Sequence, residues 1–457
     1  MGATHVIFLS KPSYIEFRNF VLTKSLGWQS DKGFLNNQNG PEATAGTRMC
    51  ASLGIVLSLT PIQTLAAVVI AALTIFIGFY IAYAIFCVIV IKKNKKRLTH
   101  KRTGELPTVS LIIPVYNEAS TLAQKFANIE RLNYRSANLE IVFVDGGSED
   151  TSAELIDAYI KEHNKLRWLL VREGKRTGFN SGVIAGLKAS TGEIICITGA
   201  ETEYSPDALQ ALINAFSNPR IGAVSGRMVV KNTTGFSSRL EASYRRLYDL
   251  IREAESYVDS PFDVKGEISA VRRDICGHIL NKQSIARKGN IDCCFVFQSK
   301  EDGYRGTYEP NAVYAETAPS SVKDSFQQQT RRAATLMENL LLYKNLLFNA
   351  SMGYFGVLIM PAHLAMLMIL PSLFVVSVFG IIALVCLQPL NLLYTSILLV
   401  GVILLLASPY AQAFAKTQFS MFTAAIGLLL GLETQKFPRL DSARETTEKP
   451  TSDVQRS

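Results

Sequence analysis

The chain has 457 residues, too many for one ordinary domain, and its 48% hydrophobic content with a mean hydropathy of +0.18 is high for a soluble protein. A net charge of +9 would suit a nucleic-acid partner, but no zinc-finger spacing or RNA-binding signature accompanies it. The seven cysteines are scattered without CxxC spacing, so they indicate neither a disulfide framework nor a zinc site.

Residues 1–60 show no clear periodicity, and we interpret them as an extracytoplasmic segment. Met49 directly precedes an apolar region, so a start of translation there is an open alternative. Residues 61–91 are predicted to form a transmembrane helix. The run Leu65 to Ile91 contains no charge and alone exceeds the roughly 20 residues needed to cross a bilayer.

The linker 92–105 begins with the basic run KKNKKRLTHKR. Basic clusters beside a transmembrane helix stay on the cytoplasmic side, so everything after Lys92 is predicted to begin inside the cell. A nuclear-localisation or nucleic-acid patch is the alternative interpretation of this run.

Two runs of apolar and β-branched residues then end abruptly in polar side chains, VSLIIPV before Tyr116 and LEIVFV before Asp145. This pattern is typical of buried parallel strands that carry loops at their carboxyl ends. An apolar helical pattern joins the two runs and completes a βαβ unit. Because open sheets bind ligands beyond these strand ends, we expect Tyr116, Asn117, Glu118 and Asp145 around one cleft.

Strand and helix patterns continue to alternate, which predicts an α/β domain over residues 106–350 with a doubly wound parallel sheet. The expected elements are a helix at 151–164, a strand at 166–171, a helix at 180–189, a strand at 193–198, a helix at 206–216 and a strand at 221–230.

PVYNE and VDGGSED resemble the opening motifs of the family 2 glycosyltransferases, inverting enzymes with a GT-A fold that take a sugar from a nucleotide donor. Gly146 and Glu149 depart from the usual VDDGSTD. The resemblance implies that Asp145 contacts the base of the donor, whose imide or amide hydrogen a carboxylate can accept. An isolated aspartate here would instead cap the helix that begins near Thr151.

The loop EGKRTG presents Lys175 and Arg176 at a strand end, where glycine-flanked cations suit a diphosphate; a solvated basic turn is the alternative. The next loop, GAETEYSPDAL, resembles the DxD segment of the family, with Gly199 and Glu201 at the two acidic positions. The resemblance implies Mg²⁺ or Mn²⁺ bound by Glu201, weakened by the lost carboxylate, with Glu203 as a substitute. The alternative role for Glu201 is charge at a helix N-terminus.

Further along, VKGEISAVRRDI and GNIDCCFVFQSKEDGY resemble the acceptor side of the family. Asp292 takes the place of the last acid there and Ile291 precedes it, so the resemblance implies that Asp292 is the base that accepts the acceptor proton. Its alternative role is a helix N-cap. Gln328 and Arg331 match a QxxRW motif only partly, because Arg332 stands at the tryptophan position and offers no flat apolar platform for a sugar.

Residues 351–432 are predicted as a C-terminal membrane region with two or three spans, and the charged tail 433–457 as disordered. The resemblance implies a membrane-embedded enzyme related to cellulose and hyaluronan synthases, with its catalytic domain on the cytoplasmic face of the plasma membrane. Its partners would be a nucleotide sugar, UDP-linked rather than GDP-linked, a lipid-linked or polysaccharide acceptor and membrane lipids, but no nucleic acid. A degenerate nucleotide-sugar-binding subunit is the alternative, given Gly199 and Ile291.

The site residues implied by the resemblance are the base Asp292, the metal ligand Glu201 and a donor-binding group of Pro114, Tyr116, Glu118, Asp145, Lys175, Arg176, Gln328, Arg331 and Arg332.

Overall fold

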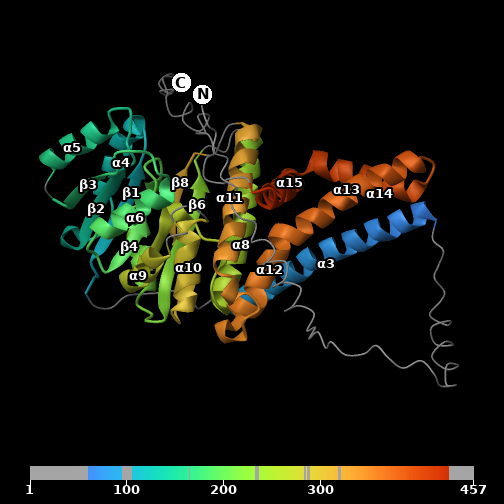
Figure 1. The fold of residues 1–457 in the computed structure, drawn as a ribbon, viewed down its shortest axis with the longest axis horizontal. Helices are drawn as coiled ribbons and strands as arrows, with labels where there is room; N and C mark the ends of the chain where they lie inside the picture. Colours follow the sequence, from blue (N-terminus) through green and yellow to red (C-terminus); the bar gives the residue numbers. More distant parts are fainter. Residues whose placement is uncertain are drawn as a thin grey trace, which may run out of the picture.

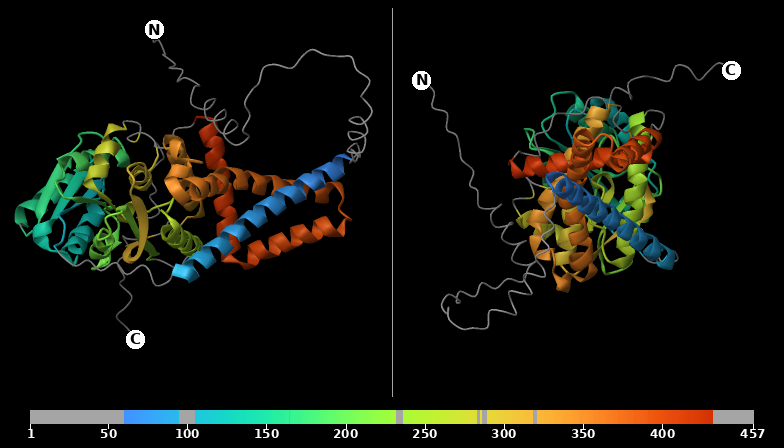
Figure 2. Two further views of the ribbon diagram at one scale, coloured as in Figure 1. Left: turned by 90° about the horizontal axis from the view of Figure 1, so that it is seen from below. Right: turned by 90° about the vertical axis from the view of Figure 1, so that its right-hand side faces the viewer.

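The computed structural model describes residues 60–94, 105–163, 165–231, 236–282, 285, 289–317 and 321–431. The predictions made for residues 1–59, for most of the basic linker and for the tail lie outside these residues. An α/β domain occupies one end of the molecule, and long apolar helices extend from its other side (Figures 1 and 2).

In the described residues, the domain is built on one eight-stranded sheet with the order β3-β2-β1-β4-β7-β6-β8-β5. The strands are β1 (Val109–Val115), β2 (Leu139–Asp145), β3 (Arg167–Arg172), β4 (Ile194–Ile197), β5 (Glu203–Tyr204), β6 (Ile221–Val230), β7 (Ser269–Arg272) and β8 (Arg305–Glu316).

The first half of the sheet confirms the predicted parallel alternation, since β1 pairs in parallel with both β2 and β4, and β2 with β3. The second half corrects it, because β7 runs antiparallel to both β4 and β6, and β5 runs antiparallel to β8. β7 has only four residues and its apolar pattern is too short to reveal a strand or its direction from sequence.

Helices cover both faces of the sheet. One face packs against α4 (Ala119–Glu130), α5 (Ser152–Glu162) and α7 (Ala208–Ala215). The other face packs against α6 (Phe179–Ala189), α9 (Arg273–Asn281), α10 (Ile291–Glu301) and α11 (Val322–Leu342). All side chains of β2, and all of β1 except the half-buried Pro114, are buried, which explains why these sequences are almost continuously apolar. Short 3₁₀ turns occur at Ser136–Asn138, Gly266–Ile268, Lys344–Leu346 and Ala350–Met352.

Within the part of the chain that the structure describes, two helices are long and apolar enough to cross a membrane, α3 (Pro61–Asn94) and the helix Phe355–Leu387. At about 1.5 Å per residue, the 34 residues of α3 exceed the length that a bilayer requires. α14 (Leu392–Ala407) and α15 (Pro409–Leu429) pass the same test as a pair, bent by 108°. The number of C-terminal spans therefore depends on whether this bent pair counts as one.

The helix Phe355–Leu387 contains two prolines and is continuous. Its α-helical parts are α12 (Met360–Leu364) and α13 (Leu370–Leu387), and each has its proline, Pro361 or Pro371, at the start. A π-helical turn precedes each part, at Phe355–Ile359 and Ala365–Ile369. The wider turns accommodate the missing proline N–H groups, so the prolines do not divide the segment.

The amphipathic helix α8 (Phe236–Val258) joins the two parts of the molecule (Figure 1). A buried cluster unites Ala254 of α8 with Phe76 and Tyr83 of α3, Met366 of the second π-helical turn and Leu370 of α13. The α/β domain and the apolar helices consequently share a packed core.

Candidate active site

The strand registers bring several chain segments to one edge of the sheet. β1 and β2 end together, with Val115 opposite Asp145. β7 runs antiparallel to β4, so its first residue, Ser269, lies opposite Ile197 at the end of β4. β8 runs parallel to β6, and Glu316 therefore also lies toward this edge. The loops after β1, β2 and β4, the end of β8 and the turn before β7 all lie at this edge.

The loops after β1 and β2 are tied together by hydrogen bonds. The Asn117 backbone N–H donates to Ser148 Oγ at 3.0 Å, and Asn117 Oδ1 accepts the Glu149 backbone N–H at 2.7 Å. Asn117 has a φ of 54°, an uncommon backbone conformation that asparagine tolerates better than most residues. The buried Glu118 accepts the hydroxyl of Thr121 at 3.1 Å, so its carboxylate faces its own helix.

Asp145 is 5% exposed and turns its carboxylate toward its own loop. It accepts the backbone N–H groups of Gly147 at 3.3 Å and Ser148 at 3.2 Å. It does not cap α5, because Asp150 Oδ1 accepts the Ser152 N–H at 3.0 Å there. Asp145 therefore shapes the loop at the predicted donor position, and its contact with a base stays a prediction.

The predicted basic loop lies against these two loops. The Arg176 guanidinium sits over the Tyr116 ring, 4.5 Å from its centroid. Gly147 has a φ of +76°, and a Cβ there would lie 2.9 Å from Lys175 Cα, so only glycine allows the two loops to touch. Pro114 lies beside Gly182 of α6, and a Cβ on Gly182 would be 3.4 Å from the proline ring.

Glu201 follows β4 at the same edge. The Glu201 residue is exposed to solvent, but the surrounding protein removes part of the water around its carboxylate. This desolvation, together with the nearby charge of Glu267, raises the pKa of Glu201. Arg331 of α11 and Lys125 of α4 oppose the shift. Among the residues that the structure describes, no three His, Cys, Asp or Glu side chains form a metal-binding group.

Asp292 lies in the first turn of α10, packed against the turn before β7. Asn290 occupies the N-cap position, so Asp292 is not the N-cap. Its Oδ2 approaches the backbone so closely that a Cβ on Gly266 would be only 2.8 Å away. Burial, and next the charge of Glu267, raises the pKa of Asp292 to about 7.

α11 supplies the cationic side of this centre. Arg332 pairs with Glu267 at 3.7 Å, and the Tyr314 hydroxyl donates to the same carboxylate at 3.2 Å. Burial would raise the pKa of Glu267, but Arg332 and then Lys265 lower it. Arg331 interacts electrostatically with Glu201, while Gln328 is half-buried on the same helix.

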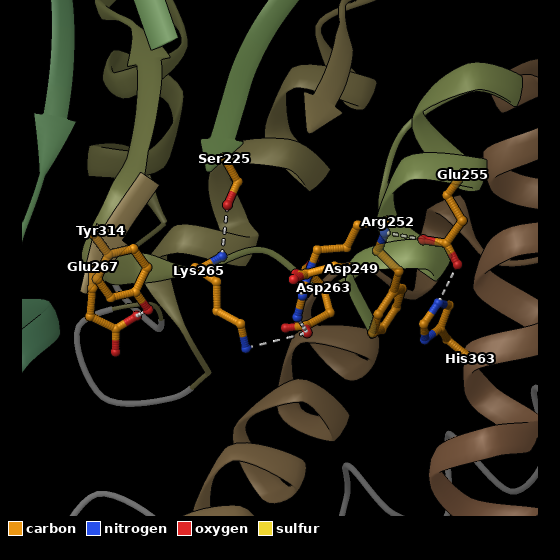
Figure 3. Close-up of polar contacts among 10 residues, drawn as sticks. Ser225, Asp249, Arg252, Glu255, Asp263, Lys265, Glu267, Tyr314 and His363 are labelled. Carbon is orange, nitrogen blue, oxygen red and sulfur yellow. Dashed lines mark hydrogen bonds and ion pairs between the residues drawn. The ribbon is translucent and has the colours of Figure 1, made fainter. Parts of the chain in front are cut away.

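A series of buried charged residues extends from this centre toward the apolar helices (Figure 3). The Lys265 ammonium lies 3.8 Å from Asp263 Oδ2, and Arg252 forms an ion pair with that carboxylate and donates through Nε to the Asp263 carbonyl at 2.8 Å. Although burial opposes it, Arg252 holds the pKa of Asp263 well below its usual range. Burial, with the charges of Arg245 and Arg252, lowers the pKa of Lys265 to about 7.

The last residue of this series is Glu255, a fully buried carboxylate that contacts three elements (Figure 3). Its Oε1 accepts the Tyr83 hydroxyl of α3 at 2.5 Å and lies 2.6 Å from His363 Nε2 of α12. Its Oε2 accepts the Phe262 backbone N–H at 2.9 Å. The Phe262 ring also stacks on His363, with centroids 4.2 Å apart, so the segment 259–266 is anchored to both apolar helices.

Sequence reasoning located the loops but missed the charges between them. Glu267, Lys265 and Glu316 were not singled out, and neither was the Glu255–His363 contact. One signal was present, because His363 is an ionisable residue inside a long apolar run, and such residues are commonly functional or paired. The others required knowledge of β7, whose antiparallel placement brings them to the edge.

Comparisons with known proteins agree with this arrangement. Residues 110–280 match the family model described as glycosyl transferase family 2. The chain carries a family 2 glycosyltransferase domain. The match spans β1, the loops after β2 and β4, and the turn before β7, and its fold is the GT-A type.

Three relatives of this family 2 domain are 25–26% identical to it. They are the beta-monoglucosyldiacylglycerol synthase of Trichormus variabilis (26% over 216 residues, 44% of this chain and 46% of that protein), the N-acetylglucosaminyltransferase of Mesorhizobium japonicum (26% over 250 residues, 53% and 58%) and the poly-beta-1,6-N-acetyl-D-glucosamine synthase of Staphylococcus aureus (25% over 248 residues, 52% and 56%). The chain thus spans about half the length of these relatives.

Among solved structures, this chain resembles the mannosyltransferase PcManGT from Pyrobaculum calidifontis, which is in complex with GDP-Man and Mn²⁺. The TM-score is 0.69 at 24% identity, over 80% of this chain and 99% of that one. Because 80% of this chain is covered, the structural likeness extends beyond residues 110–280, which the family model matches.

Proposed function

We propose that this protein is an inverting membrane glycosyltransferase that moves a sugar from a nucleotide donor to a lipid-linked or polysaccharide acceptor. The observation that carries the proposal is Asp292, a buried carboxyl with a pKa of about 7, at the sheet edge that also carries the donor-type loops. A carboxyl with such a pKa can take up a proton near neutral pH, as a general base must.

The chemistry assigned to this edge is a single displacement. The acceptor hydroxyl oxygen attacks the anomeric carbon, the bond from that carbon to the diphosphate breaks, and the nucleoside diphosphate leaves. Asp292 accepts the hydroxyl proton. We assign Lys175 and Arg176 to neutralise the diphosphate and Tyr116 and Asp145 to bind the nucleoside. The contact of the basic loop with the loops after β1 and β2 supports this assignment.

A divalent ion, Mg²⁺ or Mn²⁺, fits the residues present only if the donor brings part of its ligand set. Glu201 is the acid that would hold it, and Mg²⁺ is commonly bound by one or two carboxylates together with substrate phosphates. When bound, the ion would offset the charge of the leaving diphosphate. Arg331, which interacts electrostatically with Glu201, would bind the same group from α11.

The acceptor is assigned to the side of Asp292 that faces the apolar helices. We place α3 and Phe355–Leu387 across the plasma membrane, with the α/β domain in the cytoplasm. A lipid-linked or membrane-bound glycan would reach Asp292 from that direction. A uridine nucleotide is favoured over guanosine, in line with the sequence resemblance.

A second candidate is a nucleotide-sugar-binding subunit without turnover, which Gly199 at the first acidic position favours. Purified full-length protein in detergent distinguishes the two. The protein is tested with UDP-glucose, UDP-N-acetylglucosamine and GDP-mannose. We expect one of these nucleotide sugars to raise the melting temperature of the protein and to be hydrolysed in a metal-dependent reaction.

Asp292→Asn is the control for this experiment, because it should retain the stabilisation and lose the hydrolysis. Stabilisation without hydrolysis in the unmodified protein would support the binding subunit. If no nucleotide sugar of the panel stabilises the protein and none is hydrolysed, the proposed function is refuted.

A further inference from the structure

Lys125 is a buried ammonium directly behind the loop that carries Glu201. The residue lies on α4 and is 2% exposed. Its Nζ donates to Thr198 Oγ1 at 3.0 Å, to the Thr202 carbonyl oxygen at 3.0 Å and to Thr202 Oγ1 at 3.4 Å. An ammonium group has three N–H donors, so all three are used within this loop. Burying a cation is costly unless it is bonded in this way.

The same contacts close the loop into a compact turn. Thr198 Oγ1 and Thr202 Oγ1 are 2.7 Å apart, and Thr202 Oγ1 also lies 2.9 Å from the Gly199 carbonyl oxygen. One helical turn further along α4, the Asn128 side chain makes two hydrogen bonds to the Tyr204 backbone, at 2.7 Å and 2.9 Å. α4 therefore holds both ends of the segment that presents Glu201.

Gly199 provides the space that Glu201 uses. A Cβ on Gly199 would lie 2.8 Å from Glu201 Oε2 and 3.1 Å from both Oε1 and Cδ. The Glu201 side chain thus turns back over the glycine. Gly199 is not among the glycines with positive φ, so other residues could adopt its backbone conformation. What the glycine contributes here is the room above it.

We propose that Lys125 and Gly199 are positioning residues for Glu201. Lys125 fixes the backbone of the loop and opposes the negative charge of the carboxylate. Gly199 lets the longer glutamate fold back, so that one carboxylate occupies the space that two acids would otherwise share. The departure from the two-acid pattern is then compensated within the loop. This inference rests on the proposed function, because the ligand of Glu201 is the divalent ion that accompanies the donor diphosphate.

The test measures Mn²⁺ binding in the presence of UDP or GDP by electron paramagnetic resonance, using full-length protein in detergent. Lys125→Met should weaken Mn²⁺ binding about 10- to 100-fold, as loss of groups that orient a metal ligand generally does. Lys161→Met, on the exposed face of α5, is the matched control and should bind as the unmodified protein does.

Gly199→Ala tests the same idea without risk to folding. Only the flexible end of Glu201 has to move, so we expect an unchanged melting temperature together with several-fold weaker Mn²⁺ binding. Gly277→Ala on α9 is its control, because a Cβ there meets nothing within 4 Å. If Lys125→Met does not fold, the Mn²⁺ affinity of Gly199→Ala alone tests the inference.

Suppose that the unmodified protein binds Mn²⁺ with a nucleotide and that both variants bind it equally tightly. This result overturns the inference about Lys125 and Gly199 but leaves the proposed function standing. If the unmodified protein binds Mn²⁺ with neither UDP nor GDP, the metal-assisted donor site fails and this inference fails with it. Weaker binding in the variants but not in their controls supports it.

Discussion

Asp292→Asn should increase stability above neutral pH while it strongly reduces turnover. The folded protein holds the pKa of this carboxyl at about 7, compared with 3.8 for an ordinary aspartate. Below about pH 4 the carboxyl is protonated in both the folded and the unfolded chain. As the pH rises, the unfolded chain loses its proton first, so the folded state loses stability until the pH passes about 7.

The size of this effect follows from the shift. A difference of about 3 pKa units at about 1.36 kcal/mol per unit gives roughly 4 kcal/mol as an upper bound, because local relaxation reduces it. An asparagine has nearly the same shape and no charge to bury. The variant should therefore melt at the same temperature as the unmodified protein near pH 4 and several degrees higher at pH 8.

The assay records melting temperatures in detergent from pH 4 to pH 8, alongside donor hydrolysis. We expect kcat to fall by about 10²- to 10⁴-fold, the usual contribution of a general base. Glu154→Gln, which removes an exposed carboxylate from α5, should change neither quantity. Parallel pH profiles for Asp292→Asn and the unmodified protein would refute the buried-base reasoning, and retained turnover would remove Asp292 from the mechanism.

Three further changes test other parts of the site. Gly147→Ala should cost about 1–2 kcal/mol for its left-handed backbone alone and should weaken UDP binding, since its Cβ would push the basic loop away; equal UDP affinity would contradict the loop contact. Glu255→Leu should lower the free energy of unfolding by roughly 3 kcal/mol, because buried donors lose their acceptor, whereas Glu253→Leu on the same helix should be mild; similar melting temperatures would disprove this. Arg332→Trp, which introduces the family residue, should reduce kcat/KM because Glu267 loses its ion pair, and a gain in kcat/KM would show that the platform matters more.

The parallel half of the fold was predictable because its signals are local and long. The strands β1 to β4 and the helices between them follow from apolar runs, periodicity and loop chemistry, and the observed bounds differ from the predicted ones by a few residues. The positions of the loop residues after those strands could be predicted for the same reason, while their roles stay predictions. Parallel strands end at one edge, so Tyr116, Asp145 and Glu201 could be placed together without coordinates.

The centre around Asp292 was not predictable in the same way. Its environment depends on β7, a four-residue strand, and on Gly266, whose importance appears only because Asp292 packs against its backbone. The partners Glu267 and Arg332 lie 65 residues apart in the sequence and meet only through the antiparallel placement of β7 and the packing of α11. No pattern within a short window contains that information.

The Glu255 contacts also bear on how such a protein can be produced. A fragment limited to residues 106–350 would keep Glu255 but lose Tyr83 and His363, leaving a carboxylate with one backbone donor on a newly exposed apolar surface. The segment that leads to Asp292 therefore has its observed contacts only when α3 and Phe355–Leu387 are both in place. Recombinant work should accordingly start from the full-length chain rather than from a trimmed soluble domain.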